Sequence, residues 1–227
     1  MSLIVALDPP RGVDPFKWSV NLIESIGNKP AGVKVGIPLT VRVGVEGLKD
    51  ILSVSPHKLR IADMKLADIG YVMSLITEAI AETGVNAVIA HAFVGREGAL
   101  ENLKRTCDEL GVKLVVLGLM SHPGASEIMR PVFRNLLGVI KDLKPWGSVL
   151  PATMPEAIRE GREFLGKDVK ILSPGVGAQG ASPGDALCAG ADYEIVGRLI
   201  TRAEDPSLAV EEVIKAQRER VEACLGS

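Results

Sequence analysis

Short apolar runs recur along the chain, and segments with helical spacing separate them. Eight runs are candidate strands: LIVALD from residue 3, GVKVGI from 32, KLRIADMK from 58, NAVIAHA from 86, KLVVLGLM from 113, SVLPAT from 148, VKILSPG from 169 and YEIVG from 193. Apolar residues repeat at helical spacing in 71–83, 97–110, 155–165 and 206–222. Strands and helices are therefore predicted to alternate throughout.

This alternation indicates parallel strands joined by crossover helices, with apolar runs that are covered on both faces. Eight repeats in 227 residues favour an α/β fold of the compact (β/α)8 type, a TIM barrel. A doubly wound open sheet is the alternative, which periodicity alone does not exclude. No linker, low-complexity tract or change in composition divides the chain, so we expect a single domain over residues 1–227. The stretch 126–146 is longer than one short helix needs and is expected to decorate the rim.

Charge and cysteine content narrow the function classes. The 26 Lys and Arg residues nearly balance the 28 Asp and Glu residues, which argues against a nucleic-acid or anionic-membrane partner. The chain opens directly into a strand, and no segment has 18 uninterrupted apolar residues, so a cytoplasmic protein is expected. Cys107, Cys188 and Cys224 are odd in number and far apart, which argues against both a disulfide framework and a thiolate metal site.

Polar residues gather where the apolar runs stop. They are Asp8, Lys34, Asp63, Lys65, His91, Ser121, the segment 174–179 and Arg198. In a (β/α)8 barrel the C-terminal ends of the strands form the catalytic face, whereas the opposite rim serves stability. The pattern therefore predicts one polar site at that end of the barrel.

The segment DMKLAD, residues 63–68, places three charges at the end of an apolar strand. Asp63 and Lys65 are two residues apart and should share the interior face of the strand. An ion pair kept only for packing is one interpretation. The functional alternative is that Asp63 repels an anionic substrate group while Lys65 delivers a proton, with Lys34 joining the array. Asp68 is out of phase with the strand and belongs to the loop, where it could also be the N-cap of a helix from about Tyr71.

A glycine-rich stretch, LSPGVGAQGASPGD at 172–185, follows the seventh run. Its glycines allow backbone N–H groups to approach an anion, and Gln179 offers a side-chain amide. Arg198 follows Gly197 after the eighth run, and loops seven and eight form the usual phosphate site of barrel enzymes. A plain mobile connection is the alternative. The stretch lacks GxxxxGK[ST], and its GxGxxG spelling lies too late in the chain for a dinucleotide fingerprint.

Six segments carry a resemblance that covers almost the whole chain. They are VALD ending at Asp8, VKVG around Lys34, DMKLADI from Asp63 to Ile69, MSHPGA from Met120, SPGVGAQG from Ser173 and VGR ending at Arg198. By these residues the chain resembles the orotidine 5′-monophosphate decarboxylase family, in its short microbial type. The DxKxxD pattern is shared with sugar-phosphate relatives, but its combination with MSHPGA and PGVGAQG is far more specific.

The resemblance implies a homodimer that converts orotidine 5′-phosphate to uridine 5′-phosphate and carbon dioxide in pyrimidine biosynthesis, with no cofactor and no metal. It assigns catalysis to Lys65, Asp63, Lys34 and Asp68, the last reaching the site from the partner subunit. Asp63 would lie beside the substrate carboxylate, and Lys65 would protonate the ring carbon. The implied substrate-binding residues are Asp8, Lys34, Ile69, Ser121, Pro174, Gly175, Gln179, Gly197 and Arg198. Val72 and Leu199 depart from the family pattern, where hydroxyl or small polar residues are more usual.

Two other functions fit the same residues. A metal-dependent sugar-phosphate decarboxylase or aldolase would use Asp63 and Asp68 near a magnesium ion. A nucleotide-binding protein without activity would bind uridine phosphates and not turn them over. A serine nucleophile at Ser121 and His122 is not supported, because MSHPGA supplies no acid to orient the histidine.

Overall fold

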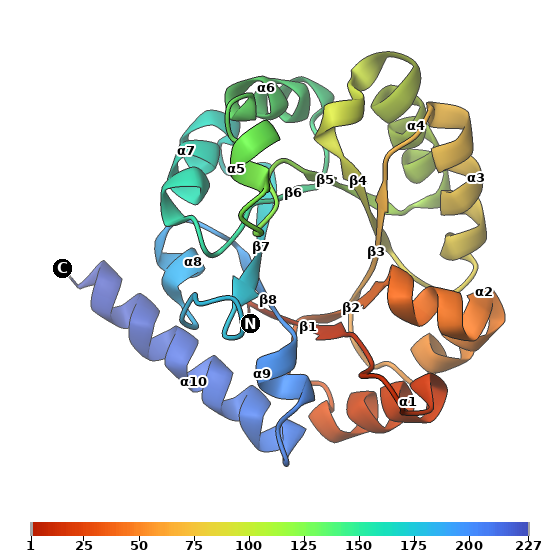
Figure 1. The fold of residues 1–227 in the computed structure, drawn as a ribbon, viewed down its shortest axis with the longest axis vertical. Coiled ribbons are helices and arrows are strands. Elements are labelled where there is room, and N and C mark those ends of the chain that lie inside the picture. The colour runs from red at the N-terminus through yellow and green to blue at the C-terminus, as the bar shows by residue number, and fades with distance from the viewer. Residues whose placement is uncertain (1, 227) are drawn as a thin grey trace.

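Eight parallel strands close into a barrel in the computed structural model, which describes residues 2–226 (Figure 1). The strands are β1 Leu3–Leu7, β2 Gly32–Gly36, β3 Leu59–Leu66, β4 Ala87–His91, β5 Lys113–Leu117, β6 Gly147–Val149, β7 Lys170–Val176 and β8 Tyr193–Val196. Each strand pairs with the next, and β1 also pairs with β8, where Ile4 is in register with Ile195. The predicted (β/α)8 barrel is therefore confirmed, because an open sheet would leave β1 and β8 apart.

Helices cover the outside of the barrel. They are α1 Pro15–Ile26, α2 Ile37–Ser53, α3 Gly70–Ala81, α4 Glu101–Leu110, α5 Ala125–Ile128, α6 Phe133–Leu143, α7 Pro155–Leu165, α8 Asp185–Cys188, α9 Arg198–Thr201 and α10 Pro206–Leu225, with short turns at Ala92–Val94 and Arg96–Leu100. The last helix lies along the outside of α8 and α9 (Figure 1). Among the described residues, no helix is long and apolar enough to cross a membrane.

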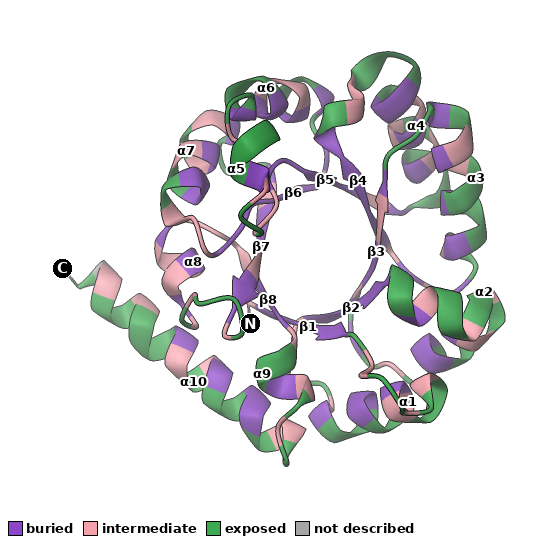
Figure 2. Ribbon diagram, in the orientation of Figure 1, coloured by how far each residue is buried: buried purple, intermediate pink, exposed green. Residues whose placement is uncertain are grey.

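The strands are buried on both faces, as parallel strands between a barrel interior and a helix layer must be. Every residue of β1, β2 and β4 is buried, and most of the ring of strands is coloured as buried in Figure 2, with intermediate positions on β3. This is why the strands appear in the sequence as apolar runs and not as alternating patterns. The buried polar side chains of the strands are Lys34, Asp63, His91, Ser148, Ser173 and Glu194.

Two local expectations need refinement. The stretch 126–146 contains most of α5 and all of α6, so it holds two helices where one short helix would have sufficed. Asp68 is not the N-cap of α3, because that position is taken by Ile69 and no side chain caps the helix there. The Asp68 carboxylate instead accepts a hydrogen bond from the Ile69 N–H at 2.7 Å.

The expectation about the cysteines is wrong for one pair. Cys188 at the end of α8 and Cys224 in α10 form a disulfide, although 36 residues separate them. Cys107 is free and buried in α4. The pairing escaped the sequence because sequence spacing does not report that α8 and α10 lie side by side.

Candidate active site

A cavity of about 490 Å³ opens at the C-terminal ends of the strands. It brings together ten of the predicted site residues: Asp8, Lys34, Asp63, Lys65, Ser121, Pro174, Gly175, Gln179, Gly197 and Arg198. Asp68 and Ile69 do not line it. The polar residues predicted from separate strand ends therefore meet in one place, with the DMKLAD charges and the glycine-rich loop in the same cavity.

Asp63 lies between two ammonium groups. Its Oδ2 atom is 3.0 Å from Nζ of Lys34 and 2.8 Å from Nζ of Lys65. Asp63 and Lys34 are each only 8% exposed, whereas the side chain of Lys65 is 37% exposed. Lys34 is thus an enclosed partner, and Lys65 is the ammonium with the more open approach to the cavity.

The backbone around Lys65 departs from regular strand geometry. Lys65 has φ of 44°, in the left-handed region that residues with a side chain seldom occupy. The pairing of β3 with β4 shifts register between Ala62 and Leu66, across this segment. Sparsely populated backbone conformations of this kind cost roughly 1–3 kcal/mol and occur often at functional sites. The irregularity lies at the residue whose ammonium pairs with Asp63 in the cavity.

Both partners of the enclosed pair are held in their charged forms. Burial alone would raise the pKa of the Asp63 carboxyl, but Lys34 and Lys65 outweigh it, so the pKa lies below its usual value. Burial would likewise lower the pKa of Lys34, and Asp63 and Asp8 outweigh it, so that pKa is raised. At neutral pH the cavity therefore holds an aspartate and a lysine, each stabilised by the other.

One oxygen of Asp63 has no partner. The Oδ1 atom is buried and accepts no hydrogen bond from the residues that the structure describes. The Oδ2 atom, in contrast, pairs with two ammonium groups. A buried carboxylate oxygen left without a donor is costly and calls for a functional explanation. The carboxylate thus retains an unsatisfied, electron-rich atom at the cavity.

His91, predicted among the strand-end polar residues, does not line the cavity. Its ring packs against Phe93, with 4.7 Å between the ring centroids. Burial, together with the nearby charge of Lys65, lowers its pKa, so the ring is neutral at pH 7. His91 accordingly contributes no charge to the site.

The glycine-rich loop forms the opposite side of the cavity from the charged array. Gly177, Gly180 and Gly184 have positive φ, and the loop closes on itself through a 2.7 Å hydrogen bond from the Gly177 N–H to the Ala181 carbonyl. Gln179 and Arg198 are exposed, and both line the cavity. An exposed amide and an exposed guanidinium at the rim of the cavity can donate hydrogen bonds to an anion that arrives from solvent.

Sequence reasoning missed the apolar wall between the two polar ends. Ile89, Leu117, Val149 and Ile195 line the cavity from four different strands, and Met120 and His122 line its edge. A signal for the four was present, since each stands in an apolar run two to four residues before the end of that run, but fully apolar strands do not reveal which face is inward. An apolar lining that adjoins charged and amide side chains fits an apolar ring that carries an anionic group.

Comparison with known proteins agrees with this geometry. The model of the "Orotidine 5'-phosphate decarboxylase / HUMPS family" matches residues 1–213. The chain belongs to this family. It is 49% identical over 212 residues to the orotidine 5′-phosphate decarboxylase of Aeropyrum pernix, covering 92% of this chain and 85% of that one. With the enzyme of Saccharolobus solfataricus it shares 37% identity, over 99% of this chain and 96% of the relative.

Solved structures of the family have the same fold. The orotidine 5′-monophosphate decarboxylase of Methanocaldococcus jannaschii, complexed with the inhibitor BMP, superposes with a TM-score of 0.86 at 30% identity, over 95% of this chain and 98% of that one. The Sulfolobus solfataricus structure gives a TM-score of 0.83 at 35% identity, over 97% and 99% of the two chains. The predicted family and its decarboxylase class are therefore confirmed, while the role of each site residue stays a prediction.

Proposed function

We propose that this chain decarboxylates orotidine 5′-phosphate to uridine 5′-phosphate and carbon dioxide, as a step of pyrimidine nucleotide synthesis in the cytoplasm. The observation that carries the proposal is the array of Lys34, Asp63 and Lys65 in one cavity with the glycine-rich loop and Arg198. The array provides a fixed negative charge beside a proton donor, and the loop provides a site for the phosphate. The names of the similar enzymes support the same substrate.

In the proposed mechanism the substrate carboxylate lies against Asp63. The bond between the ring carbon and the carboxyl carbon breaks, carbon dioxide leaves, and the electron pair remains on the ring carbon. Lys65 then transfers a proton from its ammonium to that carbon. The unpartnered Oδ1 of Asp63 supports the first step, because an unneutralised oxygen repels a second carboxylate more than the developing carbanion.

The ammonium groups act on the transition state. Enzymes lower barriers by roughly 8–23 kcal/mol, and contacts made equally in substrate and transition state do not raise turnover. Charged groups that Asp63 and Lys34 hold in place before the reaction do not have to reorient while negative charge builds on the ring. Solvent water would have to reorient during the same step.

The remaining contacts orient the substrate. Asp8 and Lys34 are assigned to the ribose, Ser121 to the pyrimidine, and Gln179 and Arg198 to the phosphate. Pro174, Gly175 and Gly197 present backbone to the bound nucleotide, and Ile69 is assigned to the substrate as the neighbour of Asp68, although it does not line its own chain's cavity. Closure of the loop over the phosphate would assemble and dehydrate the site, which couples phosphate binding to turnover.

The proposal includes a homodimer in which Asp68 enters the partner's site. Asp68 is exposed and outside its own chain's cavity. Large apolar side chains are exposed in the segments that follow three neighbouring strands: Ile37, Val41, Ile69, Tyr71 and Phe93. Because β2, β3 and β4 are adjacent, these side chains form one apolar rim around Asp68, as a subunit interface requires. Val72 lies in the same segment and offers no hydroxyl to the partner.

The test follows the absorbance of orotidine 5′-phosphate with purified protein in excess EDTA, alongside Lys65→Ala. We expect conversion to uridine 5′-phosphate by the wild-type protein and its loss in the variant, whose fold is checked by circular dichroism. Folded wild-type protein that leaves the substrate unchanged would refute the proposal. Metal-requiring turnover of a sugar phosphate would then identify the related class, and nucleotide binding without turnover would identify a binding protein.

A further inference from the structure

Glu194 is a buried carboxylate that the proposed mechanism does not use. It stands in β8 next to Ile195, whose side chain lines the cavity, so the side chain of Glu194 points to the opposite side of the strand, toward the helices. Its exposed fraction is 0%, and none of the described lysine, arginine or histidine side chains pairs with it. A carboxylate so enclosed needs hydrogen-bond donors in place of water.

The donors come from the segment that follows the glycine-rich loop. The N–H of Gly184 donates to both carboxylate oxygens, at 2.9 and 2.8 Å, and the N–H of Ala186 donates to Oε1 at 3.1 Å. Gly184 is the residue at which the loop ends and α8 begins. Glu194 therefore ties the C-terminal base of the loop to strand β8.

Helix α10 supplies the remaining donor, since Nε2 of Gln217 lies 2.9 Å from Oε2 of Glu194. The same helix also packs directly against the C-terminal end of the glycine-rich loop. A Cβ built at Gly184 would lie 2.5 Å from Cβ of Arg220, and Gly184 has φ of 93°. Only glycine fits this position, because the backbone of Gly184 packs directly against the Arg220 side chain of α10.

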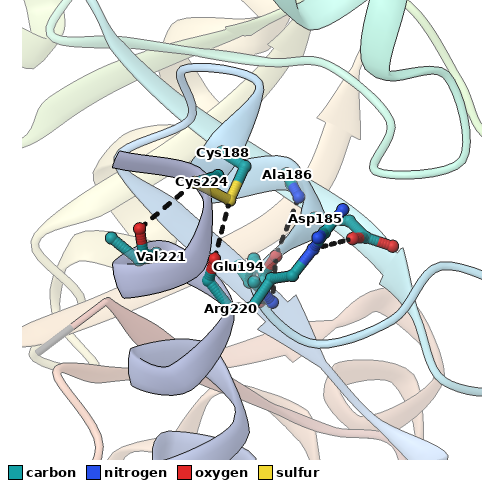
Figure 3. The surroundings of a disulfide bond; sticks show 8 residues. Asp185, Ala186, Cys188, Glu194, Arg220, Val221 and Cys224 are labelled. Atoms are coloured by element: carbon teal, nitrogen blue, oxygen red, sulfur yellow. Dashed lines mark hydrogen bonds and ion pairs between the residues drawn. A yellow bond between two sulfur atoms is a disulfide. The ribbon is translucent and has the colours of Figure 1, made fainter. Parts of the chain in front are cut away.

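Two further links join α8 to α10 around the carboxylate (Figure 3). Nε of Arg220 lies 2.8 Å from Oδ1 of Asp185, and Cys188 is bonded to Cys224. Asp185 also accepts a hydrogen bond at 3.2 Å from the N–H of Ser182, inside the loop. The loop base is thus held from the helix side by three different kinds of contact.

The position of Glu194 along the chain connects this anchor to the phosphate end of the cavity. Four residues after Glu194, strand β8 has ended and Arg198 begins α9. Glu194 therefore connects the two segments assigned to the phosphate. It belongs to the strand that leads to Arg198, and its carboxylate binds the segment that follows the loop bearing Gln179.

We propose that Glu194 is a positioning residue for phosphate recognition, fixing the base of the loop 177–183 against β8 and α10. It touches no substrate atom and acts through the placement of the loop N–H groups and Gln179 relative to Arg198. The proposal rests on the proposed function only in taking this loop as the phosphate site. It also makes the outer helix α10, far from the reacting atoms, part of the support of that site.

The experiment compares ligands with and without phosphate. Titration calorimetry measures the affinities of wild-type protein, Glu194→Leu and Glu194→Gln for uridine 5′-phosphate, uridine and inorganic phosphate. The leucine leaves the N–H groups of Gly184 and Ala186 without acceptors, and we expect affinity for both phosphate-bearing ligands to fall about tenfold, with uridine unchanged. The glutamine keeps an acceptor for these N–H groups and can meet a rotated Gln217 amide, so it should stay within about threefold of wild type.

Asp192→Asn is the matched control. This carboxylate lies two residues earlier in the chain and accepts hydrogen bonds from Arg162, Lys170 and the Ile171 N–H, and none of its hydrogen bonds or ion pairs among the described residues reaches the loop or α10. Its loss should lower the melting temperature without changing the ratio of affinities for uridine 5′-phosphate and uridine. The control separates a general loss of stability from displacement of the loop.

Gln217→Leu keeps the test decisive if Glu194→Leu does not fold, because it removes only the donor from α10. We expect it to weaken phosphate-bearing ligands by several-fold. Unchanged affinities in the folded variants, or equal weakening of uridine and uridine 5′-phosphate, would overturn the proposal. Failure of wild-type protein to turn over orotidine 5′-phosphate would refute the proposed function and leave the inorganic phosphate measurement valid.

Discussion

Lys65 approaches Asp63 from a backbone conformation that strands do not normally contain. Its Nζ lies 2.8 Å from the aspartate Oδ2, while its φ is 44° and the ladder between β3 and β4 is out of register beside it. Strand alternation would already place two side chains two residues apart on one face. The left-handed backbone at Lys65 and the shifted register show that this pair stands in an irregular part of β3, at the site, and not in its regular strand.

Removing the charge of Asp63 should weaken the fold at neutral pH. Asp63→Asn removes the ion-pair partner of the buried Lys34 ammonium and leaves only its weaker interaction with Asp8, and loss of one member of a buried pair typically costs about 3–5 kcal/mol. The folded-state pKa of Asp63 is depressed below 3.8, so its contribution is present above that pH and disappears as pH falls through the folded value. Urea unfolding from about pH 7 to about pH 2 checks this, with the wild-type advantage narrowing only below about pH 4. If the difference in unfolding free energy between wild type and Asp63→Asn stayed constant down to about pH 2, the depressed pKa of Asp63 would be contradicted.

Phosphate contacts should contribute to turnover as well as to binding. Gln179→Ala combined with Arg198→Ala should raise KM and also lower kcat for orotidine 5′-phosphate, by at least about tenfold each, if loop closure assembles the site. The matched control is Arg202→Ala, which removes an arginine just after α9 that does not line the cavity. Steady-state kinetics decide the point. A raised KM with unchanged kcat would mean that phosphate binding is not coupled to the chemistry.

A shared site can be detected with two inactive variants. Lys65→Ala and Asp68→Ala should each be inactive alone, but a hybrid dimer has one site with an intact Lys65 and an Asp68 from the partner. Random exchange of subunits then restores about one quarter of the wild-type activity, since half of the dimers are hybrids with one good site of two. The measurement is activity after the two variants are mixed, unfolded and refolded together. No recovery from folded dimers would place Asp68 in its own subunit's site or outside both.

The disulfide between α8 and α10 should stabilise the chain. A cross-link over 36 residues contributes about 4 kcal/mol by loop-closure entropy, so a reductant should lower the free energy of unfolding by about that amount. Cys188→Ser is the control, because its stability should not respond to reductant. Thiol alkylation reports the pairing independently: burial, with Asp108 nearby, raises the pKa of Cys107 to about 12, so the native oxidised protein should take up no reagent. Alkylation of the native protein without reductant would disprove the bond.

The sequence predicted the barrel and the gathering of polar side chains because both depend on simple patterns. Fully buried strands produce apolar runs, and parallel strands bring their C-terminal ends to one face, so Asp8, Lys34 and Asp63 could be expected to meet there. The turn at Lys65 was not predictable, because no residue in DMKLAD signals positive φ. The Cys188–Cys224 bond and the Glu194–Gln217 contact depend on how helices pack across the outside of the barrel, which periodicity within each helix does not encode.

The closure of β1 against β8 has a consequence for the order in which the molecule can form. β1 has one neighbour within reach early in synthesis, but its other neighbour begins at Tyr193, after more than four fifths of the chain. Until then the outer edge of β1 has no strand to pair with, and contacts so distant in sequence form slowly. The strand that supplies this edge also carries Glu194 and leads to Arg198. Closure of the barrel and completion of its anion-binding end therefore depend on the same late-synthesised strand.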